Sequence, residues 1–429
     1  MMRLVDIREE FENYIVFKDK FILQVVFATI VGNALIDREP VWLMIVAPSS
    51  GGKSTVLAPL SAIPTCFPID DLTEKTLLSG FKGKKETSLL KIIGSGIMVF
   101  SDFTSILTKN PKSLGEILTQ LKLVYDRKVT KYTGLGGTGW EGKIGVAAAS
   151  TPDIYTYMEY GRSMGERFTY YWLEQPTNDE IITKQEQVKM SSKEISGRME
   201  EYYRGYMEDI RLWEDKNGTP ELVLSEEQLD AIRKAAIFCV KGKATVHTDF
   251  RSGKPDAIPN IAGVGRDIKI FNTMVHSLLL MKAYEEDDKN ATVDEDMIAI
   301  VEKCAYSSIN RERRKILEIL IERDGAMTSS NIGAATGLGL EKESVEKYLH
   351  PLHAVGIIKK KAGGGAHQWF IDDPWVIDYI KRVAPGTHDH TPVETLIEPV
   401  NEEEEAKSEL DLWLEQNKHP IEEENEEPL

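Results

Sequence analysis

The chain has 429 residues and a formal net charge of −17, with 41% hydrophobic and 28% charged residues. These values describe a soluble globular protein with two or three domains. No apolar run reaches the roughly 18 residues of a membrane-spanning helix, and the N-terminus lacks the apolar stretch of a signal peptide. Three widely spaced cysteines, Cys66, Cys239 and Cys304, show no metal-ligand spacing, so we expect buried thiols in a reducing cytoplasm.

Changes in composition divide the chain into five parts. An N-terminal helical segment (1–40) precedes an α/β core (41–176), a helical lid or insert (177–306), a winged helix-turn-helix (307–385) and an acidic, disordered tail (386–429). The tail holds fifteen Asp and Glu residues against two Lys, a charge of −13 that leaves only −4 for the rest of the chain. The negative total therefore does not exclude a body that binds nucleic acid.

The first predicted element is a helix over residues 8–35, where apolar residues recur at helical spacing. The apolar run 41–46 then predicts a buried strand. The stretch 47–55, Ala-Pro-Ser-Ser-Gly-Gly-Lys-Ser-Thr, follows this strand and precedes a segment that can form a helix. A strand, a glycine-rich turn, Lys-Ser and a helix form the arrangement that binds a nucleoside triphosphate.

This phosphate loop predicts the residues that would hold ATP and Mg²⁺. Backbone N–H groups cradle phosphate oxygens, Lys53 reaches the β- and γ-phosphates, and the Ser54 hydroxyl ligates Mg²⁺. Position 47 is Ala, where the pattern has Gly, and an ordinary turn before a helix is the alternative interpretation. The predicted ATP-binding residues of the loop are Ser49, Ser50, Gly51, Gly52, Lys53, Ser54 and Thr55.

A second Mg²⁺ ligand is expected at the end of a neighbouring strand. Asp102 has this position because it follows the apolar strand 97–100 and Ser101. A helix cap or turn is the alternative role for this carboxylate. Position 103 is Phe, where a Glu usually polarises the attacking water. The base would therefore be Ser101 or Asp102 in a shifted role, or one of Asp70, Asp71 and Glu74.

The rest of the core continues the alternation of strands and helices that indicates a parallel α/β sheet. Asn110 and Pro111 are the expected cap and first residue of a helix that runs to Tyr125. Segments 127–132 and 139–143 flank a glycine-rich turn and predict a β-hairpin.

The next buried strand, 144–149, ends at Ser150-Thr151, which we expect to lie beside the Asp102 strand. A hydroxyl there could contact the γ-phosphate, although a strand-ending turn explains Ser-Thr-Pro equally well. Arg162 and Arg167 precede the last strand, 168–173. An Arg here could reach across a subunit boundary to a transferring phosphoryl group, and a surface salt bridge is its alternative role.

Helical patterns dominate residues 177–306. Residues 311–372 then show three helices and a pair of strands, with glycines in the turns, which is the order of a winged helix-turn-helix. Its predicted recognition helix has almost no net charge. Docking to another protein is therefore almost as good an interpretation as recognition of DNA.

Candidate nucleic-acid contacts combine cations with aromatic residues, which suits phosphate tracking and base stacking. A solvated, charged loop is the alternative for each. They are Phe81, Lys82, Lys84 and Lys85 in a loop, Arg127, Lys128 and Lys131 in the hairpin, and Lys359, Lys360 and Lys361 in the wing.

Together, these features resemble the AAA+ ATPases. They comprise the phosphate loop, the strand to Asp102, the hairpin, Ala148-Ala149-Ser150-Thr151-Pro152-Asp153 and Gly165-Glu166-Arg167-Phe168. The resemblance is closest to the hairpin-bearing branch that includes minichromosome-maintenance-type and phage or mobile-element helicases. It implies Thr151 as sensor-1, Arg167 as an arginine finger acting in a ring, and Arg266 as the sensor-2 residue of the lid. The departures are Ala47, Phe103, Thr151 where Asn is common, and no N-terminal DNA-binding domain.

The fold class implied is α/β: a P-loop AAA+ parallel sheet between helices, a helical lid, a C-terminal winged helix-turn-helix and a disordered acidic tail. The resemblance also implies ATP and Mg²⁺ as cofactors and coupling of ATP hydrolysis to DNA translocation or remodelling, helicase-like, in phage or mobile-element replication. Expected partners are single-stranded or duplex DNA, other copies of the chain in a ring, and a replication protein bound through the acidic tail. Two alternatives stay open: a helicase or transposase loader, and a winged-helix DNA-binding regulator switched by ATP.

Overall fold

The computed structural model describes residues 2–73, 76–78, 88–133, 136–155, 167–244, 246, 255, 258–259, 261–337, 342–363 and 366–384. Residues Met1–Pro385 form one compact unit. The acidic tail lies outside the described residues, as do Phe81, Lys82, Lys84, Lys85 and Arg162.

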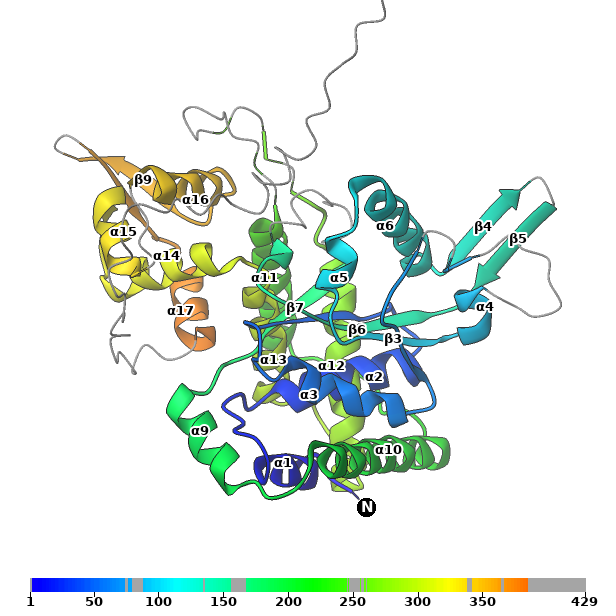
Figure 1. Ribbon diagram of the computed structural model, residues 1–429. Helices are drawn as coiled ribbons and strands as arrows, with labels where there is room; N and C mark the ends of the chain where they lie inside the picture. Colours follow the sequence, from blue (N-terminus) through cyan, green and yellow to red (C-terminus); the bar gives the residue numbers. More distant parts are fainter. Residues whose placement is uncertain are drawn as a thin grey trace, which may run out of the picture. The chain divides into compact units, whose positions relative to one another are not determined.

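Five parallel strands form the central sheet (Figure 1), in the order β2-β3-β6-β1-β7. Every residue of β1, β3 and β6 is buried, as expected for parallel strands covered on both faces. The predicted α/β fold with a parallel sheet is therefore confirmed. The strands are β1 Trp42–Val46, β2 Cys66–Pro68, β3 Gly96–Phe100, β6 Ile144–Ser150 and β7 Phe168–Trp172.

The single helix predicted over 8–35 is wrong, because the chain forms two helices there: α1 Leu4–Glu12 and α2 Ile22–Ala34. Asp19, between them, is completely buried. Its carboxylate accepts hydrogen bonds from the backbone N–H of Phe21 at 2.9 Å and from the hydroxyl of Tyr171 at 2.6 Å. A distant tertiary partner thus overrides the local helical pattern.

Short helices connect the core strands: α3 Lys53–Leu57, which continues as the 3₁₀ turn Ala58–Ala62, then α4 Leu89–Ile93, α5 Thr104–Leu107 and α6 Pro111–Tyr125. Figure 1 shows α2 and α3 below the sheet and α5 and α6 above it. Helix α6 begins as predicted, because the Asn110 side chain accepts a hydrogen bond from the Ser113 N–H at 3.0 Å.

The predicted hairpin is confirmed as β4 Lys128–Thr133 and β5 Gly136–Glu141. Its second strand begins three residues earlier than predicted, because the antiparallel ladder continues to the pair Thr133–Gly136. Glycines that suggested a turn are therefore part of a strand.

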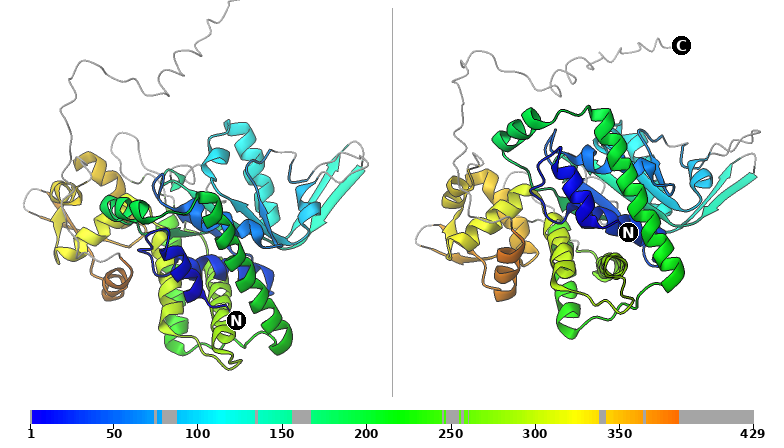
Figure 2. Two further views of the ribbon diagram at one scale, coloured as in Figure 1. Left: turned by 60° about the horizontal axis from the view of Figure 1, so that its bottom comes forward. Right: turned by 90° about the horizontal axis from the view of Figure 1, so that it is seen from below.

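Residues 177–306 are largely helical, as predicted, and pack directly on the core. Helix α12 contacts α2, α13 contacts β7, and α10 lies beside α1 (Figure 2). The helices are α9 Asn178–Gln187, α10 Ser192–Asn217, α11 Glu226–Lys243, α12 Gly265–Glu286 and α13 Glu295–Ser307.

Residues 311–383, which we call the C-terminal module, contain three helices, a small sheet and a final helix that the sequence pattern did not predict. The sheet has the order β8-β10-β9, and Trp369 on its central strand is 1% exposed. The elements are α14 Arg311–Glu322, β8 Met327–Thr328, α15 Ser329–Thr336, α16 Lys342–Ala354, β9 Lys359–Ala362, β10 His367–Phe370 and α17 Pro374–Val383.

Candidate functional site

The predicted phosphate loop, residues 47–55, begins at the carboxyl end of β1. Two of its residues have left-handed backbone conformations. The φ angles are 61° at Ser50 and 76° at Gly52, the residue before α3. Glycine adopts such angles at little cost. Gly51 is required for a different reason: a Cβ atom there would lie 2.5 Å from Gln175 Oε1 and 2.9 Å from the carbonyl oxygen of Pro48.

Lys53 is held over this loop by backbone groups. Its Nζ donates to the carbonyl oxygens of Ala47 and Pro48, each at 2.7 Å. Burial lowers the pKa of Lys53, and the nearby carboxylate of Asp102 acts in the opposite direction. Lys53 and Asp102 follow the carboxyl ends of β1 and β3, so the two residues assigned to the triphosphate and its Mg²⁺ lie at the same edge of the sheet.

The strand that carries Ser150, β6, lies beside β3, as the sequence predicts, and it also pairs with β1 on its other side. Asp102 follows β3, and its carboxylate accepts the Thr104 N–H at 2.9 Å, a turn contact at the start of the short helix α5, whose N-cap is Phe103. The Ser150 and Thr104 hydroxyls are 3.1 Å apart, and the Thr151 hydroxyl donates to Asp153 at 3.0 Å. Hydroxyl and carboxylate groups thus gather at the carboxyl edge of the sheet.

Phe103 occupies the position where a Glu usually polarises the attacking water. It is 1% exposed, and its ring lies 5.3 Å from that of Phe100 and 5.6 Å from that of Phe168. Among the alternative bases, Asp71 binds Lys109 at 2.7 Å, and this bond lowers the pKa of Asp71. Asp70 is exposed, and Glu74 lies outside the described residues.

A cavity of about 220 Å³ opens beside the phosphate loop. Its walls come from the loop, from residues 14–19, from residues 173–176 and from α9. Gln175 joins two of these walls, because its side-chain NH₂ donates to the carbonyl oxygens of Gly51 (3.3 Å) and Leu173 (3.0 Å). The volume is below the roughly 300–1,000 Å³ of whole small-molecule sites, so the cavity suits one part of a ligand. Sequence reasoning missed these walls, since the segments carry no motif.

Arg167 and Arg266 lie at the opposite edge of the sheet. Residue 167 directly precedes Phe168, which is the register partner of Trp42 at the start of β1. The two guanidinium groups lie over the same Tyr125 ring, at 5.4 Å and 5.8 Å. Arg167 is 9% exposed in its side chain and pairs with Asp126 at 3.3 Å. A strand of five residues spans about 16 Å, so neither arginine reaches the phosphate loop of its own subunit.

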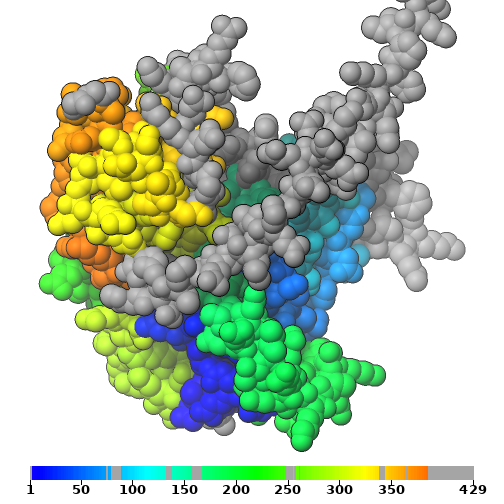
Figure 3. Space-filling view, turned by 60° about the vertical axis from the view of Figure 1, so that its left-hand side comes forward, coloured from blue at the N-terminus to red at the C-terminus, as the bar shows by residue number. Residues whose placement is uncertain are grey.

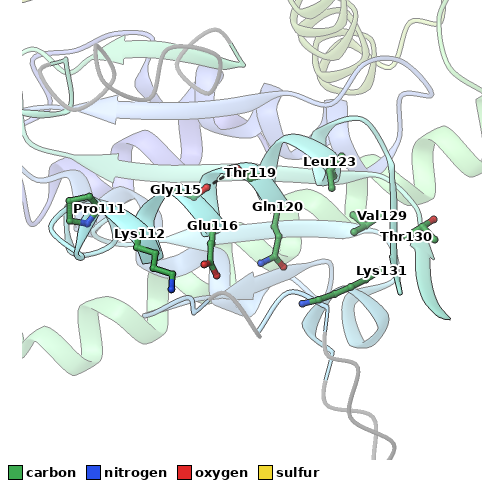
Figure 4. Close-up of a pocket in the computed structure, with 10 residues that line it drawn as sticks. All are labelled: Pro111, Lys112, Gly115, Glu116, Thr119, Gln120, Leu123, Val129, Thr130 and Lys131. Carbon is green, nitrogen blue, oxygen red and sulfur yellow. Dashed lines mark hydrogen bonds between the residues drawn. The ribbon is translucent and has the colours of Figure 1, made fainter. Parts of the chain in front are cut away.

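The predicted basic hairpin does not form one continuous patch. Arg127 donates to the carbonyl oxygen of Arg38, and Lys128 faces Glu141 at 3.7 Å. Lys131 instead lies in a groove of about 600 Å³ between α6 and β4, where Lys112, Glu116 and Gln120 also project (Figure 4). This groove shares no lining residue with the cavity beside the phosphate loop.

Lys359, Lys360 and Lys361, which the sequence places in a predicted wing, lie on β9 at the edge of the small sheet, and all are exposed. Lys359 binds Asp372 at 2.6 Å, whereas Lys360 and Lys361 lie over the rings of Trp369 and Phe370 at 5.8 Å and 5.6 Å. Cations beside aromatic rings suit nucleic acid, and lysines on an edge strand also discourage pairing with other strands.

Comparison with known proteins found no family model and no curated protein that matches the chain. In the described part of the chain, no helix combines the length and apolar character needed to cross a bilayer. Nor do three His, Cys, Asp or Glu side chains among these residues gather into a metal-binding group.

Proposed function

We propose that the chain is a P-loop ATPase of the AAA+ type that acts on DNA. The observation that carries this proposal is the position of Lys53, held over the loop by two carbonyl oxygens, beside Asp102 and next to a cavity. The loop would hold the triphosphate, and the cavity would hold the base or ribose. Three free, buried cysteines accord with a cytoplasmic location.

Mg²⁺ fits the donors at this edge. It prefers few protein ligands together with phosphate oxygens and water, so one hydroxyl and one carboxylate suffice. We assign these roles to Ser54 and Asp102. When bound, the ion would neutralise charge on the phosphates. Thr151 would contact the γ-phosphate or orient water from the neighbouring strand.

The paired arginines support a ring. Because Arg167 and Arg266 lie about one strand length from their own loop, they can contact a triphosphate only in another copy of the chain. In a head-to-tail assembly, the amino edge of one subunit would face the carboxyl edge of the next. To act as a finger, Arg167 would exchange Asp126 for a phosphate oxygen.

The C-terminal module supports contact with DNA. Its order of helices and strands is that of a winged helix-turn-helix, and its wing presents Lys360 and Lys361 beside aromatic rings. Together with Lys131 and the basic loop 81–85, these cations would follow the phosphate backbone. We therefore propose translocation on DNA or its remodelling, helicase-like, as the output of the ATPase.

One observation favours a second candidate function. Phe103 is packed in the core, so the usual position of the water-polarising carboxylate holds no acid. Slow hydrolysis suits an ATP-switched loader of a helicase or transposase, or a winged-helix DNA-binding regulator. The acidic tail could then recruit the partner.

The decisive experiment measures ATP binding and hydrolysis without DNA, with single-stranded DNA and with duplex DNA. Lys53→Ala should abolish hydrolysis, whereas Lys193→Ala, an exposed lysine on α10, should not. Unchanged turnover in Lys53→Ala would reject the site. Stimulation by DNA with strand displacement favours the motor, and DNA binding that depends on ATP without displacement favours the loader or regulator.

A further inference from the structure

Helix α13 contacts both β7, the strand that leads into one wall of the candidate nucleotide cavity, and the C-terminal module. One side of the helix packs on β7, and the other contacts α17. Figure 3 shows the module in yellow and orange next to the yellow-green helices of this region. Two neighbouring residues of α13 make these contacts: Lys303 binds carboxylates that line the cavity, and Glu302 binds residues of α17.

On the cavity side, Lys303 joins two carboxylates from cavity walls. Its ammonium group binds Asp19 at 2.9 Å and also binds Glu174. Lys303 is 12% exposed and lies over the ring of Tyr171 at 5.1 Å. Asp19 also accepts the N–H of Glu174 at 3.3 Å. One buried cation therefore fixes residues 14–19 relative to residues 173–176.

These bonds resist independent movement of α13 and the two cavity walls, residues 14–19 and 173–176. A buried carboxylate that loses its cation keeps the desolvation cost without the attraction, so Asp19 and Lys303 must move together or stay in place. A ligand that displaces either wall of the cavity therefore acts on α13.

On the module side, Glu302 holds α17. Its backbone carbonyl accepts the Tyr379 hydroxyl at 2.6 Å, and its side chain binds Arg382 at 2.7 Å. One turn further, the Tyr306 hydroxyl donates to Glu318 of α14 at 2.8 Å. The module is thus attached to the same helical turns that carry Lys303.

A second contact bypasses α13. The guanidinium group of Arg314, in α14, lies 4.2 Å from the ring of Trp172. Trp172 ends β7, two residues before Glu174. If residues 173–176 move, this movement can therefore be transmitted to the module through Trp172 of β7 and Arg314 as well as through α13.

We propose that Lys303 is a positioning residue for the nucleotide cavity, and that α13 couples occupancy of this cavity to the placement of the C-terminal module. The proposal rests on the proposed nucleotide function and adds its regulation. Coupling between two sites is reciprocal, so a ligand that moves the module also changes the affinity for ATP.

The test uses the full chain and two measurements. The first is the dissociation constant for a fluorescent ATP analogue with Mg²⁺, and the second is amide hydrogen exchange in α17 with and without ATP. Arg382→Ala breaks the module contact without touching the cavity. Arg382 is 52% exposed but Glu302 is only 6% exposed, so folding of the variant is checked by its melting temperature. Lys381→Ala, the exposed neighbour on the same helix, is the matched control.

We expect Arg382→Ala to change ATP affinity by roughly fivefold or more and Lys381→Ala to leave it unchanged. ATP should slow exchange in α17 of the wild type and of Lys303→Arg, but not of Lys303→Met. If ATP binds in a Lys53-dependent way while Arg382→Ala and α17 exchange show no effect, the coupling is wrong and the nucleotide function stands. Absence of Lys53-dependent binding overturns both.

Discussion

The two edges of the central sheet carry similar charged residues but hold them differently. At the amino edge, Lys243 and Asp267 are 8% and 5% exposed and bind each other at 2.9 Å. At the carboxyl edge, Lys53 is bonded to carbonyl oxygens of its own loop, and Asp102 accepts a backbone N–H. Lys243 and Asp267 thus neutralise each other through their side chains, whereas Lys53 and Asp102 are held by backbone groups.

This difference separates structural from ligand-binding charges. A buried ion pair is costly to break, so its members are committed to the fold. A charge held by backbone dipoles can meet a ligand of opposite sign without leaving an unpaired partner behind. Substitutions of Lys243 or Asp267 should therefore reduce stability, and those of Lys53 or Asp102 should reduce binding. Arg167 is the proposed exception, because it lies at the amino edge but would serve a neighbouring subunit.

The largest expected effect tests that exception. Arg167→Ala should lower ATP hydrolysis by about 10³-fold or more, the usual contribution of an arginine finger, and leave ATP binding intact. Mixing it with Lys53→Ala should restore part of the activity, because mixed rings contain complete sites. Arg211→Ala, an exposed arginine of α10, is the control. A parallel loss of ATP affinity, or no recovery at any mixing ratio, would contradict the role in trans.

The next effect is on stability. Lys243→Met should lower the free energy of unfolding by about 3–5 kcal/mol, since it leaves the Asp267 carboxylate buried without a cation. Asp267, despite the opposing effect of burial, holds the pKa of Lys243 above its usual value. Denaturant titration measures the change, and the double variant Lys243→Met/Asp267→Leu should recover most of it. If Lys243→Met folds but binds ATP more weakly, Lys243 contributes to ligand binding as well as to stability, and the proposed difference between the two edges is wrong.

A smaller effect is expected at the phosphate loop. Gly51→Ala should weaken ATP binding roughly tenfold, or about 1.4 kcal/mol, because the new Cβ forces Gln175 and the Pro48 carbonyl apart. Adding Gln175→Ala should relieve part of the clash. Gly115→Ala is the control, since a Cβ there meets open space, and in a helix it should stabilise by about 0.5–1 kcal/mol. Equal affinities for Gly51→Ala and wild type would show that the loop tolerates a side chain.

The smallest effect concerns pH. His276 accepts a hydrogen bond from Arg38 at 3.1 Å and bonds the Pro220 carbonyl oxygen at 2.8 Å. Burial, together with Arg38, lowers the pKa of His276 below its usual 6.5. Its contribution to stability is therefore present above about pH 6.5 and lost as pH falls through the lower pKa of the folded state. Melting temperatures at pH 7.5 and 5.5 should differ less in His276→Gln than in wild type, and an equal difference would exclude this role.

Local signals predicted much of the architecture. The apolar runs predicted the strands, Asn110-Pro111 predicted the start of α6, and the glycine-rich loop predicted a turn between β1 and α3. Each signal acts over a few residues, through backbone preferences, capping and the alternation of buried side chains. The same signals failed at residues 13–21. These residues form no helix, and the buried carboxylate of Asp19 instead binds the Phe21 N–H and the Tyr171 hydroxyl.

The sequence by itself therefore predicted most of the order of the elements and the turn between β1 and α3 that we propose binds phosphate. Only the tertiary structure decided which charges meet: Asp19 and Lys303 are 284 residues apart, and Glu174 comes from a third segment. It also placed Arg167 and Arg266 around one tyrosine, away from their own loop. Such pairings depend on how α12 and α13 pack against the sheet, and they involve no repeating spacing along the chain. Packing in three dimensions, not local periodicity, built the cavity and its link to the C-terminal module.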